Sequence, residues 1–189
     1  RTSRPSLLTS QAAERIARDP TKVNTKEKII GNYAHLVIEA HPAITDYHQI
    51  SERLSKIEHI VASSPFVQSQ ALLETKESAR GIVVRGIDLG LESKVTGIDK
   101  YLAGSAKDFD GGLFIGKELG YSLGLSLGDE LVLVNSRGRR FSLLVKGLFN
   151  SGMYDFDANV IFTDLLKAQE IFELAEGVNG ISVKIDKLF

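Results

Sequence analysis

The chain has 189 residues and carries 23 Lys and Arg against 24 Asp and Glu, which gives a formal net charge of −1. This balance excludes a strongly basic nucleic-acid-binding protein and an acidic disordered tail. Hydrophobic residues make up 43% and charged residues 25%, a composition typical of globular chains that bury a core. The absence of cysteine excludes disulfides, thiolate metal sites and a cysteine nucleophile.

Charge is distributed unevenly along the chain. Residues 1–30 carry seven basic and three acidic side chains, so their net charge of +4 leaves −5 for residues 31–189. We therefore expect the two parts to have different roles. The longest uninterrupted apolar run is Leu131–Val134, whereas a membrane-spanning helix needs about 20 mostly apolar residues. The first residues lack Met and the apolar core of a signal peptide, so we expect a processed or excised piece.

The first half of the chain predicts two helices and three strands. Alternation of apolar and polar residues indicates the strands, and apolar spacings of three and four indicate the helices. The predicted elements span residues 10–18 (helix), 34–40 (strand), 46–58 (helix), 66–74 and 80–87 (strands). Pro42 is expected to end the first strand, and Thr45 to cap the second helix.

The second half is richer in glycine and contains shorter elements. Gly124 is placed to end a helix, and Asn135–Gly138 is a hairpin signal. Thr163 is expected to cap the last helix. The predicted elements are a loop at 104–112, a strand at 113–115, a helix at 117–123, strands at 130–135 and 139–149, a loop at 150–157, a strand at 159–162, a helix at 164–174 and a strand at 181–185. This irregular order indicates an α+β fold, with a boundary near Asp88.

The sequence contains one string typical of a catalytic motif, but the elements around it are in the wrong order. Gly124–Gly128 matches the string of a nucleophile elbow around Ser126, which requires a strand before the serine, a helix after it and a histidine downstream. Here the helix comes first, and all four histidines lie upstream. We therefore interpret this segment as a turn and predict no catalytic residue.

Motifs for cofactors are also missing. The sequence contains neither a phosphate-binding loop nor a dinucleotide-binding fingerprint, so any ATP in the same system is expected to bind another chain. His35, Glu39 and His41 share one face of a predicted strand, but their spacing matches no known ligand pattern. We predict a polar surface there, and no metal or cofactor.

Two segments suggest contact with partners. The hairpin tip, made of Ser136, Arg137, Gly138, Arg139 and Arg140, concentrates three arginines, which are favoured at protein interfaces. A solvated edge protected by charge explains the same residues. The loop that follows carries three large side chains among turn residues, namely Met153, Tyr154 and Phe156. They are candidates for contact with cargo or another subunit, and burial under the adjacent sheet is the alternative.

A series of short motifs in a fixed order carries a family resemblance. The motifs are Gly31–Leu36, Val67–Leu73, Val84–Asp88, Gly112–Leu119 through Gly128–Asp129, Phe149–Asp157 and Gly180–Lys184. In this order, residues 31–189 resemble the extracytoplasmic domain of the LolC/LolE permeases of the lipoprotein-releasing ABC transporter. The wider group includes MacB-type permeases.

The resemblance implies a fold and its division into parts. It implies a MacB-like periplasmic core in which residues 31–87 and 178–189 form a porter-like α/β subdomain. A second small α/β subdomain, residues 88–177, is inserted into it. Residues 1–30 find no match, and we expect them to be a basic linker or a segment near the stalk.

The resemblance also implies a function. The domain would lie in the periplasm as part of a membrane-embedded permease, acting as a mechanical and docking element without chemistry of its own. The implied partners are a cytoplasmic ATPase, a second permease subunit, lipoprotein cargo and a LolA-like carrier. Efflux of drugs or peptides, as by MacB-type permeases, is the alternative. The hairpin Asn135–Gly138 is too short for the hook by which LolC proteins recruit their carrier, so hook-style recruitment does not carry over.

Overall fold

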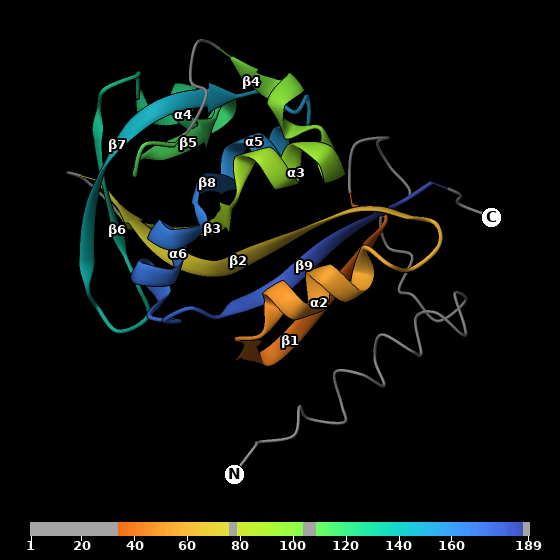
Figure 1. The fold of residues 1–189 in the computed structure, drawn as a ribbon. Helices are drawn as coiled ribbons and strands as arrows, with labels where there is room; N and C mark the ends of the chain where they lie inside the picture. Colours follow the sequence, from red (N-terminus) through yellow and green to blue (C-terminus); the bar gives the residue numbers. More distant parts are fainter. Residues whose placement is uncertain (1–33, 76–78, 104–108, 187–189) are drawn as a thin grey trace. The chain divides into compact units, whose positions relative to one another are not determined.

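The computed structural model describes residues 34–75, 79–103 and 109–186, and these residues form a mixed sheet with helices on its faces (Figure 1). The helices are α2 (Tyr47–Leu54), α3 (Leu89–Thr96), α4 (Lys117–Leu123), α5 (Tyr154–Asn159) and α6 (Leu165–Phe172), with a 3-10 turn η2 (Ile98–Tyr101). The strands are β1 (Leu36–Ile44), β2 (Ile60–Glu74), β3 (Ala79–Ile87), β4 (Leu102–Ala103), β5 (Leu113–Gly116), β6 (Glu130–Val134), β7 (Arg140–Phe149), β8 (Val160–Asp164) and β9 (Val178–Ile185). The predicted α+β class is confirmed.

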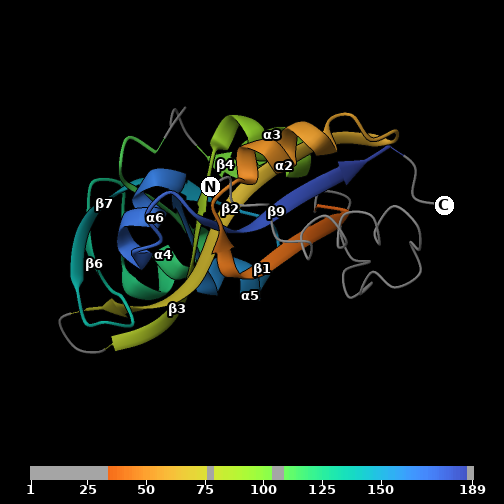
Figure 2. The ribbon, with the colours of Figure 1, turned by 60° about the horizontal axis from the view of Figure 1, so that its bottom comes forward.

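Strand pairing closes part of the sheet into a ring. β2 pairs with β3, which pairs with β8, and the series continues through β5, β7 and β6 back to β2. In the ribbon views β6 and β7 form the wall of this ring next to α6 (Figure 2). Each strand of the ring therefore has hydrogen-bonded neighbours on both sides along part of its length.

β2 belongs to two parts of the sheet. The first half of this 15-residue strand pairs with β9, which in turn pairs with the edge strand β1. Its last residues, Leu72–Glu74, pair instead with β6 in the ring. The division of residues 31–189 into two subdomains stays a prediction, but any such division must share this strand.

Apolar side chains, almost all of them aliphatic, fill the inside of the ring. The ring strands contribute most of them, and α4 and α6 add one each: Ala71, Leu73, Ile82, Val84, Leu113, Ile115, Leu119, Leu131, Leu133, Phe141, Leu143, Val145, Ile161 and Ile171. A Cβ added to Gly86 of β3 would lie 2.1 Å from the Cβ of Ala168. The glycine therefore lets α6 pack directly on β3.

The two faces of the shared strands are covered by different helices. Successive residues of a strand point to opposite faces. Phe66 clusters with Leu89 of α3, whereas Val67 clusters with Leu54 of α2 and Ala168 of α6. α3 therefore covers one face of the sheet, and α2 and α6 cover the other.

Several predicted boundaries were wrong. β1 continues through Pro42, which it tolerates because an edge strand needs few backbone donors on its free side. α2 begins after Asp46 and ends at Leu54, earlier than predicted. The expected loop 150–157 includes the start of α5. The predicted helix at 10–18 lies outside the described residues.

The cap of the last helix was also wrong. Thr163 is buried and donates its hydroxyl hydrogen bond to the carbonyl oxygen of Gly112 at 2.9 Å. The carboxylate of Asp164 caps α6 instead, accepting a hydrogen bond from the backbone N–H of Lys167 at 2.7 Å. Gly124, by contrast, ends α4 in the left-handed conformation as predicted, with φ 65°.

Candidate interaction surfaces

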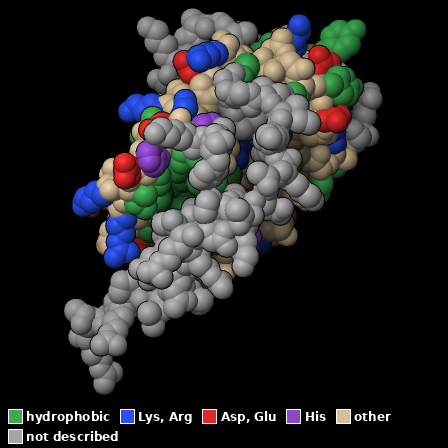
Figure 3. All heavy atoms as spheres, turned by 90° about the vertical axis from the view of Figure 1, so that its right-hand side faces the viewer, with side chains coloured by type: hydrophobic (Ala, Val, Ile, Leu, Met, Phe, Trp, Pro, Cys, Tyr) green, Lys and Arg blue, Asp and Glu red, His purple; other side chains and the backbone are tan. Residues whose placement is uncertain are grey.

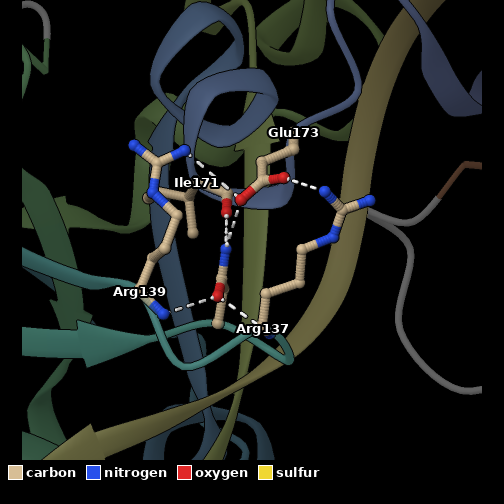
Figure 4. A network of polar contacts seen from close by, with 5 residues as sticks. Arg137, Arg139, Ile171 and Glu173 are labelled. Carbon is tan, nitrogen blue, oxygen red and sulfur yellow. Dashed lines mark hydrogen bonds and ion pairs between the residues drawn. The ribbon is translucent and has the colours of Figure 1, made fainter.

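The β6–β7 hairpin is held in place by a buried asparagine. Asn135 Oδ1 accepts hydrogen bonds from the backbone N–H groups of Arg137 and Arg139, each at 3.0 Å. Its Nδ2 donates to the carbonyl oxygen of Ile171 in α6 at 2.8 Å (Figure 4). One side chain thus shapes the turn and fastens it to the end of α6.

Glu173 extends this attachment to two of the predicted arginines. Its carboxylate lies between Arg137 and Arg139 (Figure 4), forming ion pairs with Arg137 Nη1 through Oε2 and with Arg139 Nη1 through Oε1, the latter at 3.3 Å. Glu173 itself adopts a left-handed backbone conformation, with φ 56°, at the end of α6. The hairpin is therefore a fixed part of the surface.

The third arginine of the hairpin is paired elsewhere. Arg140 Nε and Nη2 donate to the two carboxylate oxygens of Glu74 in β2, at 2.9 and 3.0 Å. These hydrogen bonds hold the pKa of Glu74 below its ordinary value and outweigh the partial desolvation of the carboxylate, which acts in the opposite direction. A planar, bidentate pair of this kind also fixes the orientation of the guanidinium.

The predicted docking segment is exposed despite these internal contacts. The side chains of Arg137, Arg139 and Arg140 are 72%, 60% and 68% exposed. Each guanidinium therefore keeps a solvent-facing surface while a carboxylate holds its position. The structure is compatible both with docking and with a solvated edge, so the role of Ser136–Arg140 stays a prediction.

In the second predicted contact segment, one large side chain is exposed and two are half-buried. Tyr154 is 69% exposed at the start of α5. Phe156 is half-buried and packs edge-on against Phe149, with ring centroids 5.8 Å apart. Met153 is also half-buried. Of the three candidates, Tyr154 is thus the one presented to solvent, and contact with cargo stays a prediction for all of them.

A buried aspartate that the sequence analysis missed positions this segment. Asp157 is 2% exposed, and its Oδ1 accepts hydrogen bonds from the Ser151 hydroxyl at 2.6 Å and the Ser151 N–H at 3.0 Å. The Ser151 hydroxyl in turn accepts one from the N–H of Met153 at 3.2 Å. The signal in the sequence was a serine shortly before an acidic first helical turn.

Two histidines contact residues at the end of β9, and histidine side chains lie at separate places on the face shown in Figure 3. His59 Nδ1 lies 3.0 Å from Asp186 Oδ1, and the N–H of Ile185 donates to His35 Nδ1 at 3.2 Å. These two histidines thus hold the last residues of β9 rather than joining Glu39 and His41. The residues described contain no group of three or more side chains placed to hold a metal.

Ser126 lies in the turn between α4 and β6, as predicted. Its backbone N–H donates to Asp129 Oδ2 at 2.7 Å, which stabilises that turn. The helix-before-strand order thus differs from a nucleophile elbow, which needs a strand before the serine.

Comparison with known proteins finds LolC proteins among the relatives of this chain. A protein named lipoprotein-releasing system transmembrane protein LolC, from Neisseria meningitidis, is 29% identical over 154 residues, which cover 75% of this chain and 37% of the relative. A LolC of Xylella fastidiosa is 27% identical over 176 residues, covering 85% of this chain and 42% of the relative. The chain is similar to LolC. This confirms the resemblance predicted from the ordered motifs.

The LolC-like chain also has relatives among solved structures. The periplasmic region of MacB from Actinobacillus actinomycetemcomitans superposes with a TM-score of 0.53 at 15% identity, covering 75% of this chain and 66% of that one. The extracellular domain of the noncanonic ABC-type transporter YknZ, from Gram-positive bacteria, gives 0.53 at 12%, covering 80% and 82%. The MacB-like fold is thereby confirmed.

The LolC relatives are longer than this chain. The chain spans 37–42% of the length of the two LolC relatives, and no family model matches it. Within the described ranges, none of the helices has the length and apolar character needed to cross a membrane.

Proposed function

We propose that this chain is the periplasmic domain of an ABC transporter permease that releases lipoproteins from the inner membrane to a carrier protein. The observation that carries the proposal is the similarity to LolC proteins, at 27–29% identity over 75–85% of the chain. In this proposal the domain performs no catalysis and acts as a mechanical and docking element. An ATPase on the cytoplasmic side, bound through the membrane-embedded parent chain, supplies the energy.

The arrangement of strands supports a mechanical role. β1 and β9 lie side by side and pair with each other, and β9 pairs with the first half of β2. β2 continues without interruption into the closed ring, where it pairs with β6. A displacement applied at the start of β1 or the end of β9 is therefore transmitted through backbone hydrogen bonds to the ring.

The exposed surfaces supply sites for partners. In the proposed function, Arg137, Arg139 and Arg140 on the hairpin present oriented positive charge to a carrier, a lipoprotein or the second permease subunit. Tyr154 presents an aromatic side chain on a different element, α5. Exposed arginine and tyrosine are the residue types that most often carry binding energy at protein interfaces.

Export of drugs or peptides is the second candidate. The fold similarity to the periplasmic region of MacB, with a TM-score of 0.53, favours it. The identity of 15% in that comparison is lower than the identity to the LolC relatives, so we place lipoprotein release first.

Depletion of the full-length permease in its own host tests the two candidates. Lipoprotein release predicts that lipoproteins accumulate in the inner membrane, measured by fractionation and immunoblotting. Normal lipoprotein sorting combined with increased drug sensitivity would contradict lipoprotein release and favour export. A photo-crosslinking residue at Ser136, with Asp99 on η2 as the control position, would identify the protein that contacts the hairpin.

A further inference from the structure

α3 contacts the sheet through a cluster of polar side chains, some of them buried. The cluster consists of Arg85 on β3, Gln68 and Ser64 on β2, Ser182 on β9 and Glu92 on α3. The guanidinium of Arg85 donates to Gln68 Oε1 at 2.9 Å and to Ser182 Oγ at 2.8 Å. Its Nη2 lies 3.4 Å from Glu92 Oε1 of α3, a longer distance than those to the two strand residues.

The aromatic ring of Phe66 holds Arg85 in this position. The guanidinium carbon lies 3.9 Å from the centroid of the ring. A Cβ added to Gly180 would lie 2.0 Å from the ring carbon Cζ of Phe66, so the ring occupies the space that this glycine leaves. Arg85 is thus fixed by the three strands, and Glu92 is the member of the cluster that comes from α3.

The contact between Glu92 and the sheet is poorly satisfied. The side chain of Glu92 is 3% exposed, and within the described residues its Oε2 has no hydrogen-bond partner. Ser64 Oγ, on the sheet below, is also buried without one. A buried polar atom without a partner costs free energy that water recovers once the group is exposed.

α3 is capped at both ends, and the apolar side chains that anchor it are Val95, which is buried, and Leu89, which packs against the cluster of Phe66. The Asp88 carboxylate caps its start, accepting from the N–H of Leu91 at 2.9 Å, and Gly97 ends it with φ 67°. Besides Glu92, Val95 is the residue of α3 that is fully buried. The helix therefore has its own caps, and Asp88 and Gly97 flank it in extended and left-handed conformations that can serve as hinges.

From these observations we propose that α3 is a releasable cover of the sheet. It detaches as an intact helix when the contact between Arg85 and Glu92 opens, and water then hydrogen-bonds to Glu92 and Ser64. The strands below remain joined through Arg85. Such a movement allows the segment from α3 to η2 to change its position without breaking the sheet.

Hydrogen exchange of the unmodified 189-residue chain, followed by mass spectrometry or NMR, tests the proposal. We expect the amides of Glu92–Gly97 to exchange about 100-fold faster or more than the amides of Val67–Ala71 in the β2–β3 ladder, because local opening needs less free energy than global unfolding. Equal exchange rates in the two segments would overturn the proposal.

A double substitution provides a second test. Replacing the ion pair with apolar residues, in Arg85→Met with Glu92→Leu, should slow exchange in α3 about 10-fold, since apolar replacement of a poorly satisfied buried pair is often stabilising. Lys94→Met, at an exposed position of the same helix, should leave exchange unchanged. Faster or unaltered exchange of the α3 amides in a folded double variant would contradict the proposal that α3 is a releasable cover. If that variant does not fold, the measurement on the unmodified chain decides.

Discussion

The side-chain amide of Asn135 donates a hydrogen bond to the backbone carbonyl oxygen of Ile171 at 2.8 Å and so joins the β6–β7 hairpin to α6. The same side chain accepts two backbone hydrogen bonds within the turn. Since Asn135 is buried, its replacement leaves several backbone groups without a partner.

Asn135→Ala should therefore lower the free energy of unfolding by about 2–3 kcal/mol, because unsatisfied buried groups cost about 1–3 kcal/mol each and the turn can relax. Urea denaturation followed by circular dichroism measures the change. Ser136→Ala, at the next and exposed position, should alter stability by less than about 0.5 kcal/mol. An equal effect of both substitutions would show that the turn does not depend on the asparagine.

Gly116 leaves space for the backbone of α5. A Cβ at this position would lie 1.9 Å from the carbonyl oxygen of Asp157, so Gly116→Ala must displace one of two packed backbones. We expect a loss of about 3 kcal/mol or more in unfolding free energy, the range of severe overpacking. Gly81→Ala is the matched control, since nothing lies within 4 Å of its added Cβ. A Gly116→Ala variant as stable as the control would contradict the packing described.

The hydrogen bonds between Asp157 and Ser151 should hold the segment that contains Met153 and Tyr154. Asp157→Ala removes the acceptor of the Ser151 N–H and hydroxyl groups, and we expect a loss of about 2–4 kcal/mol. Ser151→Ala removes one of these donors and should cost less. Thermal denaturation gives the order of stability, and the reverse order would contradict the role of the carboxylate.

The ion pair between Glu74 and Arg140 predicts a pH dependence. The pKa of Glu74 is lowered from its ordinary value of 4.5 by hydrogen bonds from Arg140. A carboxylate whose folded-state pKa is lowered contributes stability above its unfolded pKa and loses it as pH falls through the folded value.

The difference in stability between the unmodified chain and Glu74→Gln should thus be constant near neutral pH and shrink as pH falls below about 4.5. The effect is small because the pair is exposed to solvent. Urea denaturation at a series of pH values measures it. A difference that grows on acidification would show the opposite linkage.

Charge reversal tests the hairpin as a docking surface. Replacing Arg137, Arg139 and Arg140 with Glu should weaken binding of a partner at least about 10-fold. The new carboxylates would face the acidic groups of a partner that binds the arginines, and like charges repel. The variant should remain folded, as checked by circular dichroism. Unchanged affinity in the folded triple variant would favour the solvated-edge interpretation.

The sequence predicted elements whose signals are local. Gly124 ends its helix in the left-handed conformation that glycine favours, and Asn135–Gly138 forms the expected turn. The family resemblance, carried by ordered motifs, predicted the fold. By contrast, the end of β1 and the loop expected where α5 begins depend on neighbours in the folded chain, and both predictions were wrong.

The features that the sequence did not predict depend on contacts between distant segments. α3 was missed because its buried face carries Glu92, which follows no apolar period and is placed there by Arg85. The pairing of the hairpin arginines with Glu173 and Glu74 joins separate elements. Spacing along the chain contains no information about such pairs.

The closed ring has a consequence for experiments that dissect the chain. Its strands β5, β6, β7 and β8 fall within residues 88–177, but β2 and β3 come from outside that segment. A fragment limited to residues 88–177 would therefore lack two neighbouring strands of the ring and expose its apolar interior to water. Deleting the same segment would leave β3 with an unpaired edge. We therefore expect that neither residues 88–177 nor the chain without them folds on its own. Truncations at these boundaries should yield insoluble protein.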